Sequence, residues 1–269
     1  MEPSNNPKAI LTVPMAIVIA AVVIAVAIVW LKAPAPANTA ADQAAANSAA
    51  AQTTQANIKP ITAADHILGN PNAPIKIVEY SDPSCPYCKT FFPTMQQIIN
   101  QYGPSGQVAW VYRSFPLDKP GTAPDNGTNG GILHKNAGHE SQALECAATL
   151  GGNDKFWLFA ARLYSVTPSV TPETPNGLDQ SQLPVIAKFV GLNVDDFNSC
   201  LASGKEATTV EAQYMDGLNA GVGGTPYSFM ITPSGTEIPI PGAQPYASVN
   251  AMISTVISQD LASSTSATN

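Results

Sequence analysis

The chain has 269 residues, of which 45% are hydrophobic and 12% charged, and its formal net charge is −7. This length is enough for one sizeable hydrophobic core. With 12 Lys+Arg against 19 Asp+Glu, the composition argues against nucleic acid as a partner.

The N-terminal segment predicts a membrane anchor. Between Lys8 and Lys32 lie 23 uncharged residues, AILTVPMAIVIAAVVIAVAIVWL. A helix of this length rises about 34 Å, enough to cross a hydrocarbon core about 30 Å thick. We therefore expect a short cytoplasmic segment at 1–8 and a transmembrane helix at 9–31. The alternative is a cleaved secretory signal, although the apolar part of such a signal usually has only about 7 to 15 residues.

A spacer and one folded domain are expected after the anchor. Residues 32–57 are rich in alanine and proline and contain no aromatic or branched aliphatic side chain that could build a core. Residues 58–262 have the composition of a single globular domain. The polar Ser/Thr segment at 263–269 is expected to be a disordered tail.

Hydrophobic periodicity predicts how the domain begins and ends. Residues 75–80 (IKIVEY) form a predicted strand, a helix follows to about Tyr102, and 108–113 (VAWVYR) form a second strand. At the far end, the predicted elements are strands YSFMI (227–231) and TEIPI (236–240), then an amphipathic helix from about Tyr246.

The middle of the domain is predicted to be helical. Helical spacing occurs at about 135–150, 155–164, 183–190, 195–203 and 208–220. Together with the flanking strands, this order resembles a thioredoxin layout that is split by a helical insertion at about 132–220. The expected fold class is therefore α/β.

The stretch SDPSCPYCKTFFP at 81–93 places two cysteines at the start of a predicted helix. A cysteine in the first helical turn is stabilised as thiolate by unpaired N–H groups and by the positive end of the helix dipole. Pro86 is tolerated there because its missing N–H would have no intrahelical partner. We expect Cys85 to be the attacking, exposed sulfur and Cys88 to be the more buried, resolving one.

Two cysteines with this spacing also form half of many zinc sites. The other candidate ligands form no second close Cys-x-x-Cys or His-x₃-His unit; they are Cys146, Cys200, His66, His134 and His139. His134 and His139 would lie about 140° apart on one helix. We therefore expect no metal and no other cofactor, and we interpret the histidines as ordinary polar residues.

Four stretches together resemble the DsbA-like thiol-disulfide oxidoreductases. They are VEYSDPSCPYC, LECAATLGGNDKFW, FNSCLASGK and GVGGTPYSFMI, and the resemblance covers residues 62–261. It implies a thioredoxin-like fold with a helical insertion. It also implies an enzyme that introduces disulfide bonds into exported proteins through Cys85-Pro-Tyr-Cys88 and mixed-disulfide intermediates.

The resemblance assigns roles to residues outside the cysteine pair. It implies that Glu79 is a buried acid that accepts or relays a proton, although strand alternation could instead turn Glu79 to a solvated face. It implies a cis bond between Thr225 and Pro226 beside the cysteines, with a simple turn as the alternative. These two residues, together with Pro86 and Tyr87, would contact the substrate.

The resemblance further implies a structural disulfide between Cys146 and Cys200, with two buried free thiols as the alternative. An oxidising site is useful outside the cytosol, so we expect the N-terminus in the cytoplasm and the domain on the other side of the cell membrane. The expected partners are reduced or unfolded exported proteins and a reoxidising membrane protein, quinone-linked or similar.

The direction of electron flow stays open at this point. The dipeptide between the cysteines is Pro-Tyr, which glutaredoxins also carry, whereas the best-known DsbA-type sites have Pro-His. A disulfide isomerase or a reductase is therefore an alternative to an oxidase. A further alternative is a non-catalytic binding or chaperone domain in which the bond between Cys85 and Cys88 is merely structural.

Overall fold

The computed structural model describes residues 56–122, 131–168 and 177–266. The predicted cytoplasmic segment at 1–8, the predicted transmembrane helix at 9–31 and most of the spacer at 32–57 lie outside these ranges. Among the helices that the structure describes, none combines the length and the hydrophobicity needed to cross a bilayer.

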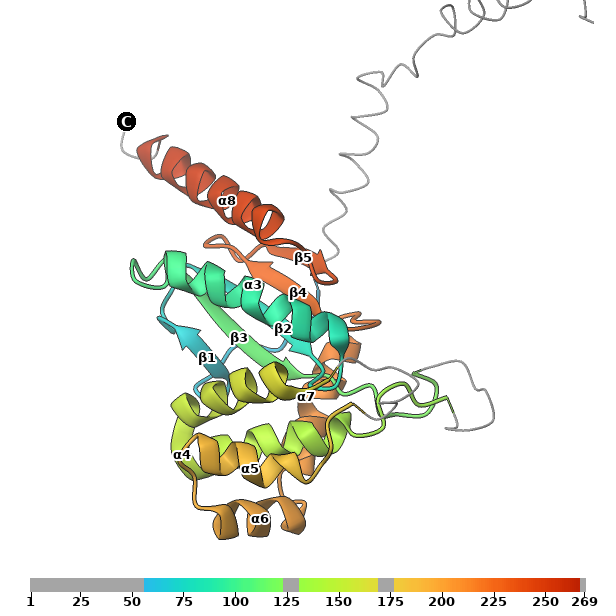
Figure 1. The fold of residues 1–269 in the computed structure, drawn as a ribbon. Coiled ribbons are helices and arrows are strands. Elements are labelled where there is room, and N and C mark those ends of the chain that lie inside the picture. The colour runs from blue at the N-terminus through green and yellow to red at the C-terminus, as the bar shows by residue number, and fades with distance from the viewer. Residues whose placement is uncertain (1–55, 123–130, 169–176, 267–269) are drawn as a thin grey trace, which may run out of the picture. The chain divides into compact units, whose positions relative to one another are not determined.

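A five-stranded mixed sheet lies at the centre of the domain, in the order β1-β3-β2-β4-β5 (Figure 1). The strands are β1 (His66–Gly69), β2 (Ile75–Ser81), β3 (Val108–Ser114), β4 (Tyr227–Ile231) and β5 (Glu237–Pro241). Strands β2 and β3 are parallel, whereas β1, β4 and β5 are antiparallel to their neighbours. β5 forms one edge of the sheet and carries the exposed Pro239 and Pro241.

Helices flank the sheet. They are α3 (Pro86–Tyr102), α4 (Ala137–Val166), α5 (Gln182–Phe189), α6 (Val194–Ser203), α7 (Ala207–Asn219) and α8 (Tyr246–Ser266). Figure 1 shows α3 lying across the sheet, and α4, α5 and α6 gathered beyond one end of it. This arrangement confirms the α/β thioredoxin-like class with a helical insertion.

The two faces of the sheet have separate hydrophobic cores, because side chains alternate along each strand. Ile75 and Ile77 of β2 pack in one core with apolar residues of α3, α4 and α8. Val78 and Tyr80 pack on the other face, toward α7 and the extended segment at 56–61. Glu79 falls on the same face as Ile77 and therefore lies under α3, the helix that carries the cysteines.

Helix α7 approaches the sheet closely because it has a glycine at the contact. A Cβ atom added at Gly217 would lie 2.5 Å from the ring of Phe115 and 2.9 Å from that of Tyr80. Such distances are far below ordinary van der Waals contact. The glycine thus sets how near α7 sits to Phe115, directly after the end of β3.

The structure differs from the predicted elements at three places. Strand β1 was not predicted, since its four residues show no clear alternation and it becomes a strand by pairing with β3. The two helices predicted at 135–150 and 155–164 form one element, α4, interrupted at Gly152, whose φ of +75° is outside the helical region. Helix α8 continues to Ser266, four residues into the predicted tail.

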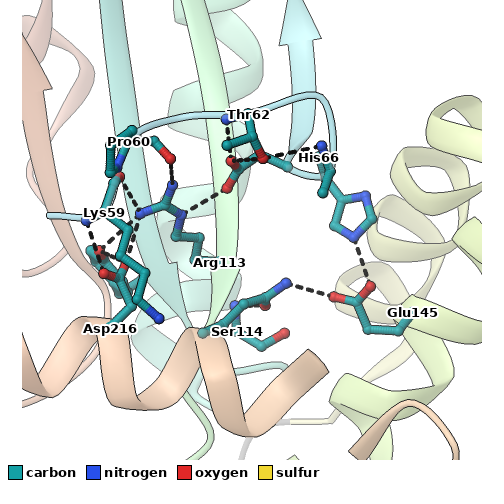
Figure 2. A network of polar contacts seen from close by, with 12 residues as sticks. Lys59, Pro60, Thr62, His66, Arg113, Ser114, Glu145 and Asp216 are labelled. Carbon is teal, nitrogen blue, oxygen red and sulfur yellow. Dashed lines mark hydrogen bonds and ion pairs between the residues drawn. The ribbon is translucent and has the colours of Figure 1, made fainter. Parts of the chain in front are cut away.

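The segment before β1 is bound to the sheet through Arg113 (Figure 2). Its guanidinium donates to the carbonyl oxygens of Lys59 at 3.1 Å and Pro60 at 3.4 Å, and pairs with Asp216 at 2.6 Å and Asp65 at 2.8 Å. The side chains of Arg113 and Asp216 are almost fully buried. Because unpaired buried charges are costly, this network holds the start of the described chain firmly on the domain.

The helical insertion is held together covalently and by polar contacts. A disulfide joins Cys146 of α4 to Cys200 of α6, with 5.9 Å between the Cα atoms, so these two residues are not the free thiols of the alternative interpretation. Glu145 accepts a hydrogen bond from Gln213 at 2.9 Å and lies 2.9 Å from Nε2 of His66 (Figure 2). These contacts connect α4 to α7 and to β1.

Candidate active site

The two free cysteines stand where β2 passes into α3. Cys85 is the residue before the first helical turn, with extended backbone angles, and its N–H donates to the carbonyl oxygen of Asp82 at 3.0 Å. Its own carbonyl oxygen accepts the N–H of Lys89 at 3.0 Å, which begins the intrahelical bonding. Pro86 occupies the first helical position, as expected from its missing N–H.

The two thiols have opposite acidities. The pKa of Cys85 is lowered to about 6, mainly by a hydrogen bond from Cys88 and also by the side chain of Thr225, while burial opposes this. The pKa of Cys88 is raised well above its ordinary value by burial and by the neighbouring Cys85. At neutral pH, Cys85 is therefore the thiolate and Cys88 the protonated thiol, which fits an attacking and a resolving cysteine.

The expectation that Cys85 is exposed is wrong: only 3% of the residue is accessible. The cause is the loop between α7 and β4, which covers the sulfur. Sγ of Cys85 lies 3.4 Å from the backbone carbonyl oxygen of Thr225, and the bond between Thr225 and Pro226 is cis, as the resemblance implied. The carbonyl oxygen of Pro226 accepts the N–H of Gly242 at 3.0 Å, which ties this loop to the end of β5.

A cavity of about 550 Å³ opens beside Cys85. Its walls include Tyr87 next to the cysteine, Thr225 of the covering loop, and several apolar side chains. The apolar lining residues are Phe115, Leu117, Leu133, Tyr214, Leu218 and Val222. Tyr87 is 66% exposed, and Leu133 and Leu218 are exposed as well. The sulfur of Cys85, whose pKa is low, thus lies at the wall of an apolar cavity that is large enough for side chains of another chain.

Glu79 is fully buried under α3, which excludes the solvated-face interpretation. Within the described residues, neither carboxylate oxygen has a hydrogen-bond partner. Burial raises the pKa of Glu79 to about 7, and the nearby side chains of Ser81 and Trp110, which do not meet hydrogen-bonding geometry, offset this only in part. The negative charge of Cys85 raises the pKa further. A buried acid that titrates near neutral pH therefore interacts with the cysteine pair.

A cluster of polar residues surrounds residues 82–85, which join β2 to α3 and are called the redox loop below. This cluster was not predicted from the sequence. The carboxylate of Asp82 is fully buried and accepts the N–H of Ser84 at 2.7 Å and of Leu117 at 2.8 Å. Nδ1 of His134 lies 2.8 Å from the same carboxylate. Glu140 accepts the hydroxyl of Ser84 at 2.7 Å, and burial raises the pKa of Glu140 to about 7.

Part of this cluster was visible in the sequence and part was not. Asp82 and Ser84 stand directly before Cys85, so their nearness to the site could have been inferred. His134 is far along the chain and was interpreted as an ordinary polar residue. The candidate zinc ligands are divided among separate places: His66 contacts Glu145, His139 contacts Gln180, and Cys146 is in the disulfide.

Comparison with known proteins relates this geometry to a family and a fold. The profile of the family described as thioredoxin matches residues 62–239. Two solved structures from Wolbachia pipientis are similar: alpha-DsbA1 (TM-score 0.61, 18% identity, 76% of this chain, 96% of that chain) and alpha-DsbA2 (0.56, 19%, 81% and 98%). BdbD from Bacillus subtilis has a TM-score of 0.55 at 19% identity, over 72% of this chain and 93% of that chain.

The curated proteins that match are sodium/proton antiporters. NhaA 1 of Mycolicibacterium gilvum is 29% identical over 101 residues, which is 38% of this chain and 14% of the antiporter. NhaA 3 of Salinispora tropica is 28% identical over 167 residues, which is 62% of this chain and 21% of the antiporter. The match thus spans only 14% and 21% of the length of these two relatives, and the similarity concerns a part of each antiporter.

Proposed function

This chain belongs to the thioredoxin family, and from that premise we propose that it is a thiol-disulfide oxidoreductase that introduces disulfide bonds into exported proteins. It is an enzyme of the protein disulfide oxidoreductase class, with a DsbA-like helical insertion. The observation that carries the proposal is the cysteine pair itself: Cys85 has a pKa of about 6 at the wall of an apolar cavity, and it is paired with Cys88, whose pKa is raised. A merely structural disulfide would need neither feature.

In the first step, a thiolate of the reduced substrate attacks Sγ of Cys85 in the oxidised enzyme. The bond between Cys85 and Cys88 breaks, a mixed disulfide forms between the substrate and Cys85, and the sulfur of Cys88 leaves with the electron pair. That sulfur needs a proton because its pKa is high. Glu79 supplies it, since an acid with a pKa near 7 is still partly protonated at neutral pH.

In the second step, another thiolate of the substrate attacks the substrate sulfur of the mixed disulfide. Cys85 is the leaving group, and a thiol of low pKa leaves fast. The substrate gains one disulfide, and two electrons stay on the enzyme as the Cys85 thiolate and the Cys88 thiol. The stability of this reduced form favours transfer of the disulfide to the substrate.

The cavity supplies the surface that holds the substrate. A reduced, unfolded protein exposes apolar side chains, which fit the apolar lining of the cavity. Pro86 and Tyr87 on one side of Cys85, and Thr225 and Pro226 on the other, are the residues that would contact the chain next to the mixed disulfide. The 66% exposure of Tyr87 supports this role.

The domain is proposed to be anchored in the cell membrane by residues 9–31, with the N-terminus in the cytoplasm and residues 32–57 as the spacer. The uncharged run of 23 residues supports this location. So does the disulfide between Cys146 and Cys200, because such bonds persist mainly in oxidising compartments. A membrane protein that passes electrons to a quinone, or a similar partner, would reoxidise the cysteine pair.

The test is to replace Cys88 by alanine in the full-length protein and to examine the disulfide-linked species formed in cells. We expect mixed disulfides between Cys85 and exported proteins, and none when Cys85 is replaced as well. A membrane-impermeant reagent tests the location of the domain: it should label the trapped protein in intact cells if the domain lies outside the cytoplasm. If the Cys88→Ala protein is folded but forms no mixed disulfide, the proposed enzyme is contradicted and the non-catalytic binding or chaperone domain is supported. Wild-type protein that only reduces or reshuffles substrate disulfides would support the reductase or isomerase.

A further inference from the structure

His134 lies at the redox site although it is far from the cysteines in sequence. It lines the same cavity as Cys85, and it is 8% exposed. Its backbone is held in place, since its N–H donates to the carbonyl oxygen of Leu117 at 3.0 Å and its own carbonyl oxygen accepts the N–H of Ala137 at 3.1 Å. The position of this imidazole is thus set by the chain on both sides of it.

The partner of His134 belongs to the redox loop. Oδ2 of Asp82 lies 2.8 Å from Nδ1 of His134 and also accepts the N–H of Leu117, while Oδ1 accepts the N–H of Ser84. A carboxylate is an acceptor-only group, and these partners all act as donors to it. Nδ1 of His134 therefore carries a hydrogen. In the described part of the chain, Nε2 has no hydrogen-bond partner, and it is the atom that gains or loses the proton.

Asp82 alone would destabilise the thiolate form of Cys85, the proposed nucleophile. Its negative charge raises the pKa of Cys85 and that of Cys88. A buried carboxylate beside a thiolate is repulsive unless a positive charge accompanies it. Among the described residues, no lysine or arginine hydrogen-bonds to Asp82, and His134 is the partner that can carry that charge.

The charges around His134 favour its protonated form. Burial lowers its pKa, but the hydrogen bond and charge of Asp82 and the charges of Cys85 and Glu140 outweigh burial, so the pKa of His134 is raised. These groups belong to two segments that surround the imidazole: Asp82 and Cys85 lie in the redox loop, and Glu140 lies in α4. All three are acidic, and all three act on the imidazole in the same direction.

We infer that His134 is a positioning residue of the redox site, which as an imidazolium held by Asp82 balances the charge of the redox loop and stabilises the Cys85 thiolate. The inference rests on the proposed role of Cys85 as the nucleophile. The oxidising strength of the Cys85–Cys88 pair then depends on a side chain outside the Cys-x-x-Cys motif, because stabilising the thiolate stabilises the reduced form. This contribution should be lost as His134 deprotonates.

The test uses the full-length protein in detergent and compares His134→Asn with His139→Asn. Asparagine at 134 retains a donor near the position of Nδ1 but cannot carry a charge. His139 is the matched control, because it is an exposed histidine close in sequence that contacts Gln180 instead. Titration of thiolate absorbance should show that His134→Asn raises the pKa of Cys85 by about one unit, a tenfold change in acidity, and makes the pair less oxidising. His139→Asn should leave both values unchanged.

A second measurement on the unmodified protein covers the case in which His134→Asn fails to fold. Coupling between two titrating groups is reciprocal, so the thiolate must raise the pKa of His134 as much as the imidazolium lowers that of Cys85. The chain has only 3 histidines, which makes their NMR signals assignable. The pKa of His134 should be about one unit higher in the reduced than in the oxidised protein. Equal values in the two states would overturn the inference.

These outcomes separate the inference from the proposed function. A low pKa of Cys85 that His134→Asn leaves unchanged would overturn the role of His134 while the oxidoreductase proposal stands. An ordinary pKa of Cys85 in the unmodified protein would contradict the proposed nucleophile, and the role of His134 would fall with it.

Discussion

Sγ of Cys85 lies 3.4 Å from the carbonyl oxygen of Thr225, although 140 residues separate them in the sequence. The contact brings the start of α3 against the loop that enters β4, so two distant parts of the chain form one wall of the cavity. This loop covers Cys85 and leaves only 3% of it accessible. A substrate sulfur must therefore approach from the cavity side, past Tyr87 and Thr225.

The first prediction concerns the hydrogen bond between the two thiols. Because the bond from Cys88 is the largest cause of the low pKa of Cys85, Cys88→Ala should raise that pKa from about 6 by about one unit or more. Cys88→Ser retains a donor, so the pKa of Cys85 in this variant should stay closer to that in the unmodified protein. Thiolate absorbance as a function of pH gives both values. Equal values for the alanine and serine variants would contradict this account of the acidity.

The second prediction concerns Glu79 and the pH dependence of stability. Its folded-state pKa of about 7 is above the unfolded value of about 4.3, so in this range the folded protein binds more protons than the unfolded chain, and stability falls as the pH rises. The loss from this one group amounts to about 3 kcal/mol by pH 8. Glu79→Gln stays neutral and should remove most of this loss.

Urea unfolding at about pH 5 and pH 8 measures the effect, with Cys85 and Cys88 oxidised so that no thiol titrates. The loss is then somewhat smaller, because an oxidised Cys85 has no charge to raise the pKa of Glu79 further. Glu140 has a raised pKa as well, so part of the pH dependence should remain. Glu211→Gln is the matched control, since Glu211 is half exposed and pairs with Lys119 at the surface. If the free energy of unfolding depends on pH in the same way in Glu79→Gln and Glu211→Gln, then Glu79 does not titrate as proposed.

The third prediction concerns the network in Figure 2. Arg113→Met leaves the buried carboxylate of Asp216 without its counter-charge and should lower the free energy of unfolding by about 3 to 5 kcal/mol. The segment at 56–61 should also become sensitive to proteases, because the bonds to Lys59 and Pro60 are lost. Lys119→Met breaks an exposed pair and should cost at most about 1 kcal/mol. Similar losses for both variants would show that burial of the Arg113 pair is unimportant.

The fourth prediction concerns the second cysteine pair. Replacing both Cys146 and Cys200 by alanine opens a loop of 54 residues and should cost about 4 kcal/mol in the chain-entropy description. Mild reduction of the unmodified protein should open the bond between Cys85 and Cys88 first, since Cys85 is a good leaving group. Mass mapping of alkylated thiols checks the order. Early alkylation of Cys146 would show that the bond between Cys146 and Cys200 is the labile one, and it would contradict the prediction.

The sequence predicted those parts of the fold that have a local pattern. The alternation of 75–80 and the helical spacing after Cys85 are local, and both elements are observed. Strand β1 and the burial of Cys85 depend on pairing with distant segments, which a local pattern does not contain. The Asp82–His134 pair is another long-range contact. Even a correct prediction of α4 would not have shown which histidine meets the redox loop.

The two prolines of β5 have a consequence for a protein proposed to handle unfolded chains. Pro239 and Pro241 are two positions apart, so both missing N–H groups are on one side of the strand, and pairing with β4 is preserved on the other. The edge of the sheet that β5 forms therefore lacks two of the donors that an extended substrate would need to add itself as a sixth strand. At the β5 edge, an unfolded substrate therefore finds few backbone partners, and its capture is left to the chemistry of Cys85.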